Sequence, residues 1–164
     1  MKLHHDKKLF YDTLRFASQH SNIKLEFIEK DYWITLVLSR LAKSKYVDDS
    51  VFKGGTSLSK GYNLIERFSE DVDIAIINDK GKTGNEIKNI IRTIEKAITL
   101  DLTEIQMDGV TSKGSRFRKS VFEYEAIKKG NTDIDFDLTS KYIHFKDVFT
   151  YKGENFMPKE YRNE

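Results

Sequence analysis

The most constraining feature of this sequence is the alternation of acidic and apolar side chains across residues 71–76. Asp71 and Asp73 alternate with Val72 and Ile74, which is the pattern of a β-strand with one buried face. Acids two residues apart share a face of the strand, with Cα atoms roughly 6.5–7 Å apart. Two ionised carboxylates this close repel each other unless a cation lies between them. The pattern therefore favours a metal site, and a solvated acidic face is the plain alternative.

A glycine turn comes before this strand. A short strand at residues 51–52 leads into Gly54-Gly55, and Thr56 or Ser57 is expected to cap the helix that follows. Glycines let the backbone approach a bulky ligand, and a helix start offers unpaired N–H groups and a partial positive charge. A phosphate is the natural occupant, with the Ser57 hydroxyl as a donor. An ordinary tight turn with a capping hydroxyl is the alternative interpretation.

The helix after the turn adds a cation. Lys60 lies one turn beyond Ser57 on nearly the same face. Its apolar line is expected to be Leu58, Tyr62 and Ile65. A phosphate-binding turn followed closely by a pair of acids favours one combined site, because Mg²⁺ prefers carboxylates together with substrate phosphates. Two such ions, about 3.5–4 Å apart, would hold both the attacking and the leaving oxygen of a phosphoryl displacement.

A third carboxylate is expected from a neighbouring strand. Asp133, Asp135 and Asp137 alternate with apolar residues, so all three acids share one face of a predicted strand at residues 134–138. An acid-lined strand beside Asp71 and Asp73 is costly without a metal ion. Asp137 is the first choice for the third ligand and Asp135 the second, whereas Asp133, next to a turn, is expected to be solvated.

The remaining pattern predicts an α+β fold in which helices flank a small mixed sheet. Two helices open the chain within residues 1–48, and a third has its apolar residues on one face between Ile87 and Ile98. Strands are expected at residues 103–107 and 117–124, and Lys128-Lys129-Gly130-Asn131 is expected to join the latter to 134–138 as an antiparallel hairpin. We expect one domain over residues 1–141, with its catalytic core at 51–141. The extension at 142–164 is weakly specified.

Composition excludes several classes of protein. A chain of 164 residues with 33% charged and 12% aromatic residues is too apolar for disorder and too charged for a membrane protein. Cysteine is absent, which excludes disulfides, thiolate metal sites and cysteine nucleophiles. The net charge of +2 says little about partners. We expect a soluble cytoplasmic protein without a membrane segment.

The motifs resemble those of a known family. The glycine turn, the Asp-x-Asp strand and the later acid are similar to nucleotidyltransferases of the polymerase β superfold. More narrowly, residues 52–60 (Phe-Lys-Gly-Gly-Thr-Ser-Leu-Ser-Lys) and 66–74 (Glu-Arg-Phe-Ser-Glu-Asp-Val-Asp-Ile) resemble blocks of the AbiEii/AbiGii toxin nucleotidyltransferases. Residues 29–33 (Glu-Lys-Asp-Tyr-Trp) and 136–139 (Phe-Asp-Leu-Thr) are similar to two further signatures of that family.

The resemblance implies a function and roles for individual residues. It implies a toxin of a type IV toxin–antitoxin or abortive-infection system that transfers NMP from an NTP to an acceptor hydroxyl, with RNA, particularly tRNA, as acceptor and an antitoxin protein as partner. Asp71, Asp73 and Asp137 would be catalytic and bind Mg²⁺, with Mn²⁺ as a substitute. The nucleotide would be held by Gly54, Gly55, Thr56, Ser57, Lys60, Arg67 and Ser69.

Three alternatives remain open on the sequence. The family continues into a helical C-terminal half, whereas this chain stops at Glu164, so a catalytically impaired NTP- or RNA-binding remnant is the first alternative. A relative that transfers AMP to a protein hydroxyl is the second. The third is a plain RNA-binding module.

Other polar residues have two interpretations each. The basic excess at Lys113, Arg116, Arg118, Lys119, Lys128 and Lys129 either follows an RNA backbone or forms a solvated surface. Arg67 either contacts a ligand or pairs with Glu70. Asp31 and Trp33 have either a packing role or a binding role. His4, His5, His20 and His144 show no metal-ligand spacing.

Overall fold

The computed structural model of this chain describes residues 2–64, 71–78, 80–114 and 117–127, together with the backbone of 142–146 and 150–151. Its helices are α1 (Lys7–Ser21), α2 (Leu25–Ala42), α3 (Gly54–Lys60) and α4 (Gly84–Ile98), with short 3-10 turns at Leu3–His5 and Val47–Asp49. Its strands are β1 (Ser50–Lys53), β2 (Asp71–Ile77), β3 (Thr103–Ile105), β4 (Ser112–Lys113), β5 (Arg118–Glu123), β6 (Tyr142–Lys146) and β7 (Thr150–Tyr151).

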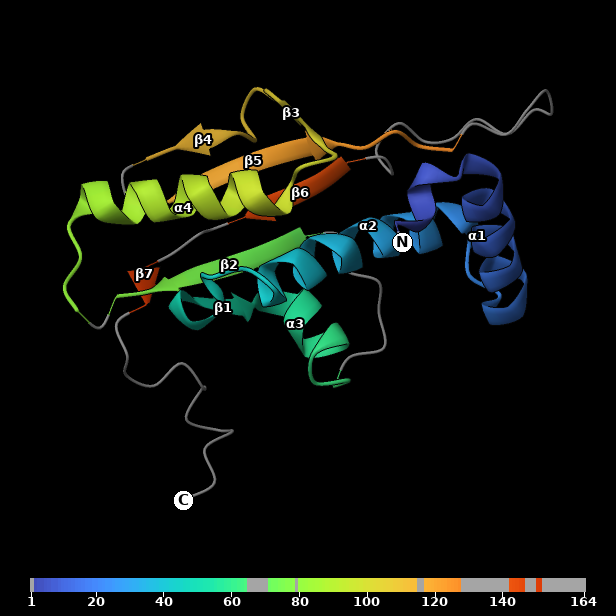
Figure 1. Cartoon of the computed structure of the whole chain (residues 1–164), viewed down its shortest axis with the longest axis horizontal. Coiled ribbons are helices and arrows are strands. Elements are labelled where there is room, and N and C mark those ends of the chain that lie inside the picture. The colour runs from blue at the N-terminus through green and yellow to red at the C-terminus, as the bar shows by residue number, and fades with distance from the viewer. Residues whose placement is uncertain are drawn as a thin grey trace, which may run out of the picture.

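The strands form one mixed sheet in the order β1-β2-β6-β5-β3 (Figure 1). β2 is antiparallel to β1 and parallel to β6, while β5 is antiparallel to β6. β7 extends the edge of β2 beyond β6, and β4 pairs with β5. The sheet contains both parallel and antiparallel strand pairs, and helices pack against it. The predicted α+β fold with a small mixed sheet is therefore confirmed.

The core lies between the sheet and two helices. α2 and α4 lie side by side over one face of the sheet (Figure 1), and α1 packs on α2. The apolar stripe predicted for residues 87–98 is confirmed: Ile87, Ile91, Ile94 and Ile98 are buried in the core, and Ile90 packs against it partly buried. α4 begins with a capping box in which the Thr83 and Glu86 side chains each accept from the other's backbone N–H. The buried core residues outside α4 are Phe10, Leu14, Trp33, Ile34, Val37, Leu41, Val72, Ile74, Ile76, Phe122 and Tyr124.

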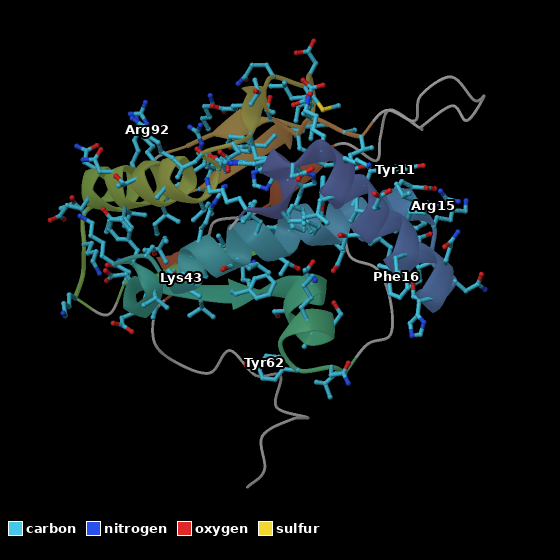
Figure 2. All side chains as sticks on the ribbon, turned by 45° about the vertical axis from the view of Figure 1, so that its right-hand side comes forward. Tyr11, Arg15, Phe16, Lys43, Tyr62 and Arg92 are labelled. Atoms are coloured by element: carbon cyan, nitrogen blue, oxygen red, sulfur yellow. The ribbon has the colours of Figure 1, made fainter. Side chains whose placement is uncertain are left out.

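The short helix α3 differs from its prediction in two ways. It begins at Gly54, and Lys53 occupies its N-cap position without a side-chain hydrogen bond, so the expected cap by Thr56 or Ser57 is wrong. The expected apolar line is also wrong, because Leu58 is 39% exposed and Tyr62 is 64% exposed and projects away from the sheet (Figure 2), while Ile65 lies outside the described residues. The two hydroxyls have other partners: Thr56 donates to the backbone of Asp71 on β2, and Ser57 donates to the carbonyl oxygen of Gly54. Tyr62 lies beyond Lys60, the last residue of α3.

β6 lies inside the sheet although its sequence pattern is weak. Residues 142–146, assigned from the sequence to the extension, form the strand between β2 and β5. They also occupy the place beside β5 that was expected for residues 134–138, which lie outside the described part of the chain. The basic turn at 128–131 likewise lies outside it. No helix in the described ranges is long and apolar enough to cross a membrane.

Candidate functional site

The pair of acids lies where the sequence predicts, on one face of β2. Val72 and Ile74 point into the core, while Asp71 and Asp73 are partly exposed on the opposite face. This follows from the pleat, which sends successive side chains to opposite sides of the sheet. β1 runs beside β2 with Lys53 opposite Asp73, so the glycine turn begins directly beyond the second acid. The turn and the acids therefore occupy one corner of the molecule.

Gly54 brings the turn into contact with Asp73. A Cβ atom placed on Gly54 would lie 2.0 Å from Oδ2 and 2.8 Å from Cγ of Asp73. Gly54 also has φ +76°, a backbone conformation that glycine adopts without strain. The Asp73 carboxylate thus fills the space that any other side chain would take. The glycine turn and the second acid are therefore packed directly against each other.

Two hydroxyls fix the start of α3. The Thr56 side chain, 1% exposed, donates a hydrogen bond to the carbonyl oxygen of Asp71. The buried Ser57 hydroxyl donates to the carbonyl oxygen of Gly54 at 2.8 Å. Thr56 thereby ties the helix to the backbone of the first acid, a bond between residues that are fifteen apart in the sequence. Ser57, expected to donate to a ligand, uses its hydroxyl within the turn.

Lys60 is held by α2. Its ammonium lies 2.7 Å from Asp31 Oδ1 and donates to Thr35 Oγ1 at 2.9 Å. Asp31 and Thr35 are one helical turn apart, so both point from the same face of α2. In this structure the lysine side chain therefore joins α3 to α2, and its expected contact with phosphate stays a prediction. The sequence left Asp31 with either a packing role or a binding role. The ion pair with Lys60 shows that Asp31 contacts a residue of α3, close to the site.

The third acid falls outside the described residues, and so do Arg67, Ser69 and the runner-up Asp135. The sheet nevertheless restricts where the chain leaves and returns around Asp137. Glu123 at the end of β5 lies opposite Tyr142 at the start of β6, and His144 lies opposite Asp71. The connection that includes residues 128–141 thus leaves and re-enters the sheet at the end where β2 begins.

Sequence reasoning missed Glu29 as a polar contact. Its side chain lies on the buried stripe of α2, 2% exposed, and its Oε1 atom accepts a hydrogen bond from the backbone N–H of Ile127 at 2.9 Å. Burial raises the pKa of the Glu29 carboxyl to about 7, and the hydrogen bond from Ile127 opposes this rise. An acid at a core position of an amphipathic helix was the available signal, because such positions are normally apolar.

A second group of potential metal ligands lies near the N-terminus. Ligand atoms of His4, His5 and Asp101 are within 4.8 Å of one another. Two cations already contact the same carboxylate, since Lys2 donates to Asp101 at 3.2 Å and Arg40 also donates to it. Although burial alone would raise it, these hydrogen bonds lower the pKa of Asp101. We therefore interpret the group as a structural link between the N-terminus, α2 and the end of α4.

Part of the basic stretch is neutralised within the protein. Arg118 on β5 pairs with Glu95 and, at 2.9 Å, with Glu104, while Lys113 lies 3.0 Å from Glu104. These two cations consequently have acidic partners on α4 and β3. Arg116, Lys128 and Lys129 lie outside the described residues. The contacts favour the plain interpretation of this stretch as surface over a path for RNA.

An α+β fold in which a glycine turn packs against a strand with two acids is consistent with a nucleotidyltransferase. The family comparison agrees: the model of the nucleotidyl transferase AbiEii toxins of type IV toxin–antitoxin systems matches residues 36–151. This chain belongs to that family. The match covers the glycine turn and both acids, whereas α1 and the first part of α2 precede it. No curated protein and no solved structure matches the chain.

The contact at Gly54 predicts the effect of adding one methyl group there. In Gly54→Ala, the new Cβ would overlap the Asp73 carboxylate, so Asp73 must leave its position. We expect a loss of Mn²⁺ binding of about tenfold or more, comparable to the effect of disturbing groups that position metal ligands. Titration of Mn²⁺ by electron paramagnetic resonance measures this directly.

Gly81→Ala is the matched control for this change. Gly81 also has a positive φ, of +65°, but nothing lies within 4 Å of an added Cβ. Both variants therefore carry the backbone strain of about 1–2 kcal/mol, and only Gly54→Ala moves Asp73. Equal Mn²⁺ affinities in the two variants would contradict the role given to the close approach.

The raised pKa of Glu29 predicts how stability depends on pH. A carboxyl whose pKa rises on folding from 4.5 to about 7 contributes stability below pH 4.5, and that contribution is lost as the pH rises through 7. The corresponding change in the free energy of unfolding is at most about 3 kcal/mol. Glu29→Gln keeps an oxygen acceptor for Ile127 but cannot ionise. We expect this variant to lose less stability than the wild type between pH 5 and 8.

Urea unfolding followed by circular dichroism at several pH values gives this comparison. Glu26→Gln, also on α2, is the control because its side chain is partly exposed and lies one turn earlier. The idea fails if the wild type and Glu29→Gln show parallel curves of unfolding free energy against pH.

Proposed function

We propose that this chain is a Mg²⁺-dependent nucleotidyltransferase that transfers NMP from an NTP to an acceptor hydroxyl. The observation that carries the proposal is the contact between Gly54 and Asp73. It places a glycine turn of the kind that binds phosphate beside two acids of the kind that bind a divalent ion. Membership of the AbiEii family supports the same class of reaction. RNA, particularly tRNA, is the proposed acceptor, and growth inhibition in the cytoplasm, countered by an antitoxin protein, is the proposed outcome.

The acids fit a divalent ion. Asp71 and Asp73 offer hard oxygen ligands from one rigid strand, and both side chains are partly exposed. Asp137, five residues before Tyr142, is the proposed third ligand. Five extended residues span at most about 18 Å, and Tyr142 begins the strand beside Asp71, so the chain length permits this. When bound, Mg²⁺ would neutralise phosphate charge and favour an ionised acceptor hydroxyl.

The remaining residues would position the reactants. The backbone of Gly54 and Gly55 would approach the triphosphate closely, with Thr56 and Ser57 keeping the turn in shape. Lys60, Arg67 and Ser69 would neutralise or hydrogen-bond phosphate oxygens. The acceptor oxygen then forms a bond to the α-phosphorus, the bond to pyrophosphate breaks, and the hydroxyl proton passes to a carboxylate, for which Asp137 is proposed. Most of the rate would come from positioning and charge neutralisation.

Label transfer from each NTP tests the proposal. The protein is incubated with Mg²⁺, total RNA and one α-labelled NTP at a time. We expect label in RNA, and we expect Asp71→Asn and Asp73→Asn to reduce transfer by about a hundredfold or more, as for loss of a main electrostatic group. Asp12→Asn, an exposed acid on α1, is the control and should retain wild-type transfer.

Other outcomes identify the alternatives. Label in protein instead of RNA would indicate an AMP-transferring relative. NTP binding without any transfer would indicate a catalytically impaired remnant. Salt-sensitive RNA binding that ignores both Mg²⁺ and Asp71→Asn would indicate a plain RNA-binding module. The first result contradicts the proposed RNA acceptor, and the other two contradict the proposed reaction.

A further inference from the structure

The side chain of Lys60 is bound to two acceptors on α2. Its ammonium lies 2.7 Å from Asp31 Oδ1 and donates to Thr35 Oγ1 at 2.9 Å. An ammonium group has three N–H donors, so these two acceptors take up most of its capacity. The pair joins the last residue of α3 to the middle of α2, and the carboxylate of Asp31 neutralises the charge of Lys60.

The proposed function gives Lys60 a second anionic partner. Gly54 begins α3 and Lys60 ends it, about 9 Å further along the helix axis. Side chains of a helix are tilted toward its N-terminal end and cover the turn before their own Cα atom. A triphosphate that extends along the glycine turn would therefore come within reach of the Lys60 ammonium.

The ammonium cannot bind both anions equally well. Its bond to Asp31 directs it toward α2, whereas a contact with phosphate would direct it along α3 toward the turn. The pair is also a weak one, because the side chains of Lys60 and Asp31 are 25% and 40% exposed and water screens ion pairs of this kind. A triphosphate carries several negative charges, so it would displace the single charge of Asp31.

A purely structural tie between α3 and α2 is the competing interpretation of this pair. α3 has another attachment, since the Thr56 hydroxyl donates to the carbonyl oxygen of Asp71 on β2. That bond holds the start of the helix to the strand of the two acids without any contribution from Lys60. Release of Lys60 from Asp31 therefore leaves the glycine turn attached to β2.

We propose that Asp31 competes with the triphosphate of the nucleotide for Lys60, which makes the ion pair an autoinhibitory contact that nucleotide binding opens. This inference rests on the proposed function, because it needs a triphosphate at the glycine turn. Before nucleotide binds, Lys60 pairs with Asp31, and afterwards it contacts phosphate. Binding must break the pair, so the apparent affinity is lowered by the fraction of molecules in which Lys60 is free.

Binding of inorganic triphosphate in the presence of Mg²⁺, measured by isothermal titration calorimetry, tests this competition without a base and without a reaction. We expect Asp31→Asn to bind triphosphate about two- to sixfold more tightly than the wild type, because the variant no longer has to break a partly exposed ion pair. We expect Lys60→Met to bind it at least about threefold more weakly, because it lacks the charged donor. A structural tie predicts the opposite sign for Asp31→Asn.

The double variant Asp31→Asn/Lys60→Met separates competition from simple repulsion. Removing Asp31 also removes a negative charge, which favours the binding of any anion nearby. If the gain acts through Lys60, it disappears when Lys60 is already methionine. Glu26→Gln removes one charge from a partly exposed position of the same helix and should leave triphosphate affinity unchanged.

Circular dichroism and thermal melting establish that each variant is folded at the assay temperature. If Lys60→Met does not fold, Lys60→Gln removes the charge and keeps a polar end, and it replaces Lys60→Met in the same cycle.

Four results would overturn the inference. They are no triphosphate binding by the wild type, unchanged or weaker binding by Asp31→Asn, unchanged binding by Lys60→Met, and a gain of the same size in the double variant. Failure of the proposed reaction is recognised separately, because it shows in label transfer by the wild type. Intact transfer without tighter binding in Asp31→Asn contradicts only the competition, and tighter binding without transfer contradicts only the reaction.

Discussion

The close approach of the Asp73 carboxylate to Gly54 is the constraint on which the arrangement of this corner depends. The approach needs two properties at once, a backbone with φ +76° and the absence of a Cβ atom, and only glycine supplies both. With the turn seated in this way, Thr56 reaches the backbone of Asp71 and α3 lies against β2. The acid pair and the turn are therefore one structural unit, although residues 58–70 lie between them in the chain.

The two sides of β2 have separate physical roles. Its core side, with Val72 and Ile74, packs under α2 and α4 and supplies the hydrophobic stabilisation that holds the strand rigid. Its other side carries the two acids, which the pleat of the strand places on one face. A strand at the edge of the sheet could fray and let these side chains separate. β2 instead has neighbours on both edges, with β1 on one side and β6 and β7 on the other.

The sequence predicted the parts of this structure that depend on local patterns. The alternation at Asp71 and Asp73 and the stripe from Ile87 to Ile98 are periodic signals, and both elements formed as expected. Contacts between distant segments were not predictable, because no local pattern encodes them. The pairing of Lys60 with Asp31 and the bond from Ile127 to Glu29 join residues far apart in the chain. The central place of β6 was hidden for the same reason: sheet order is set by partners, and its own five residues carry little pattern.

Polar contacts from a core helix couple the stability of this fold to the shape of its site. An apolar face of α2 would hold the sheet equally well, since hydrophobic contacts are non-directional. The carboxylates of Glu29 and Asp31 add direction, one toward the backbone of Ile127 and one toward the ammonium of Lys60. Breaking either contact leaves most of the buried apolar area unchanged, so its main consequence is a change in where α3 or the residue-127 segment lies. On this reasoning the Glu-Lys-Asp-Tyr-Trp stretch at residues 29–33 supports both α3 and the residues that follow β5.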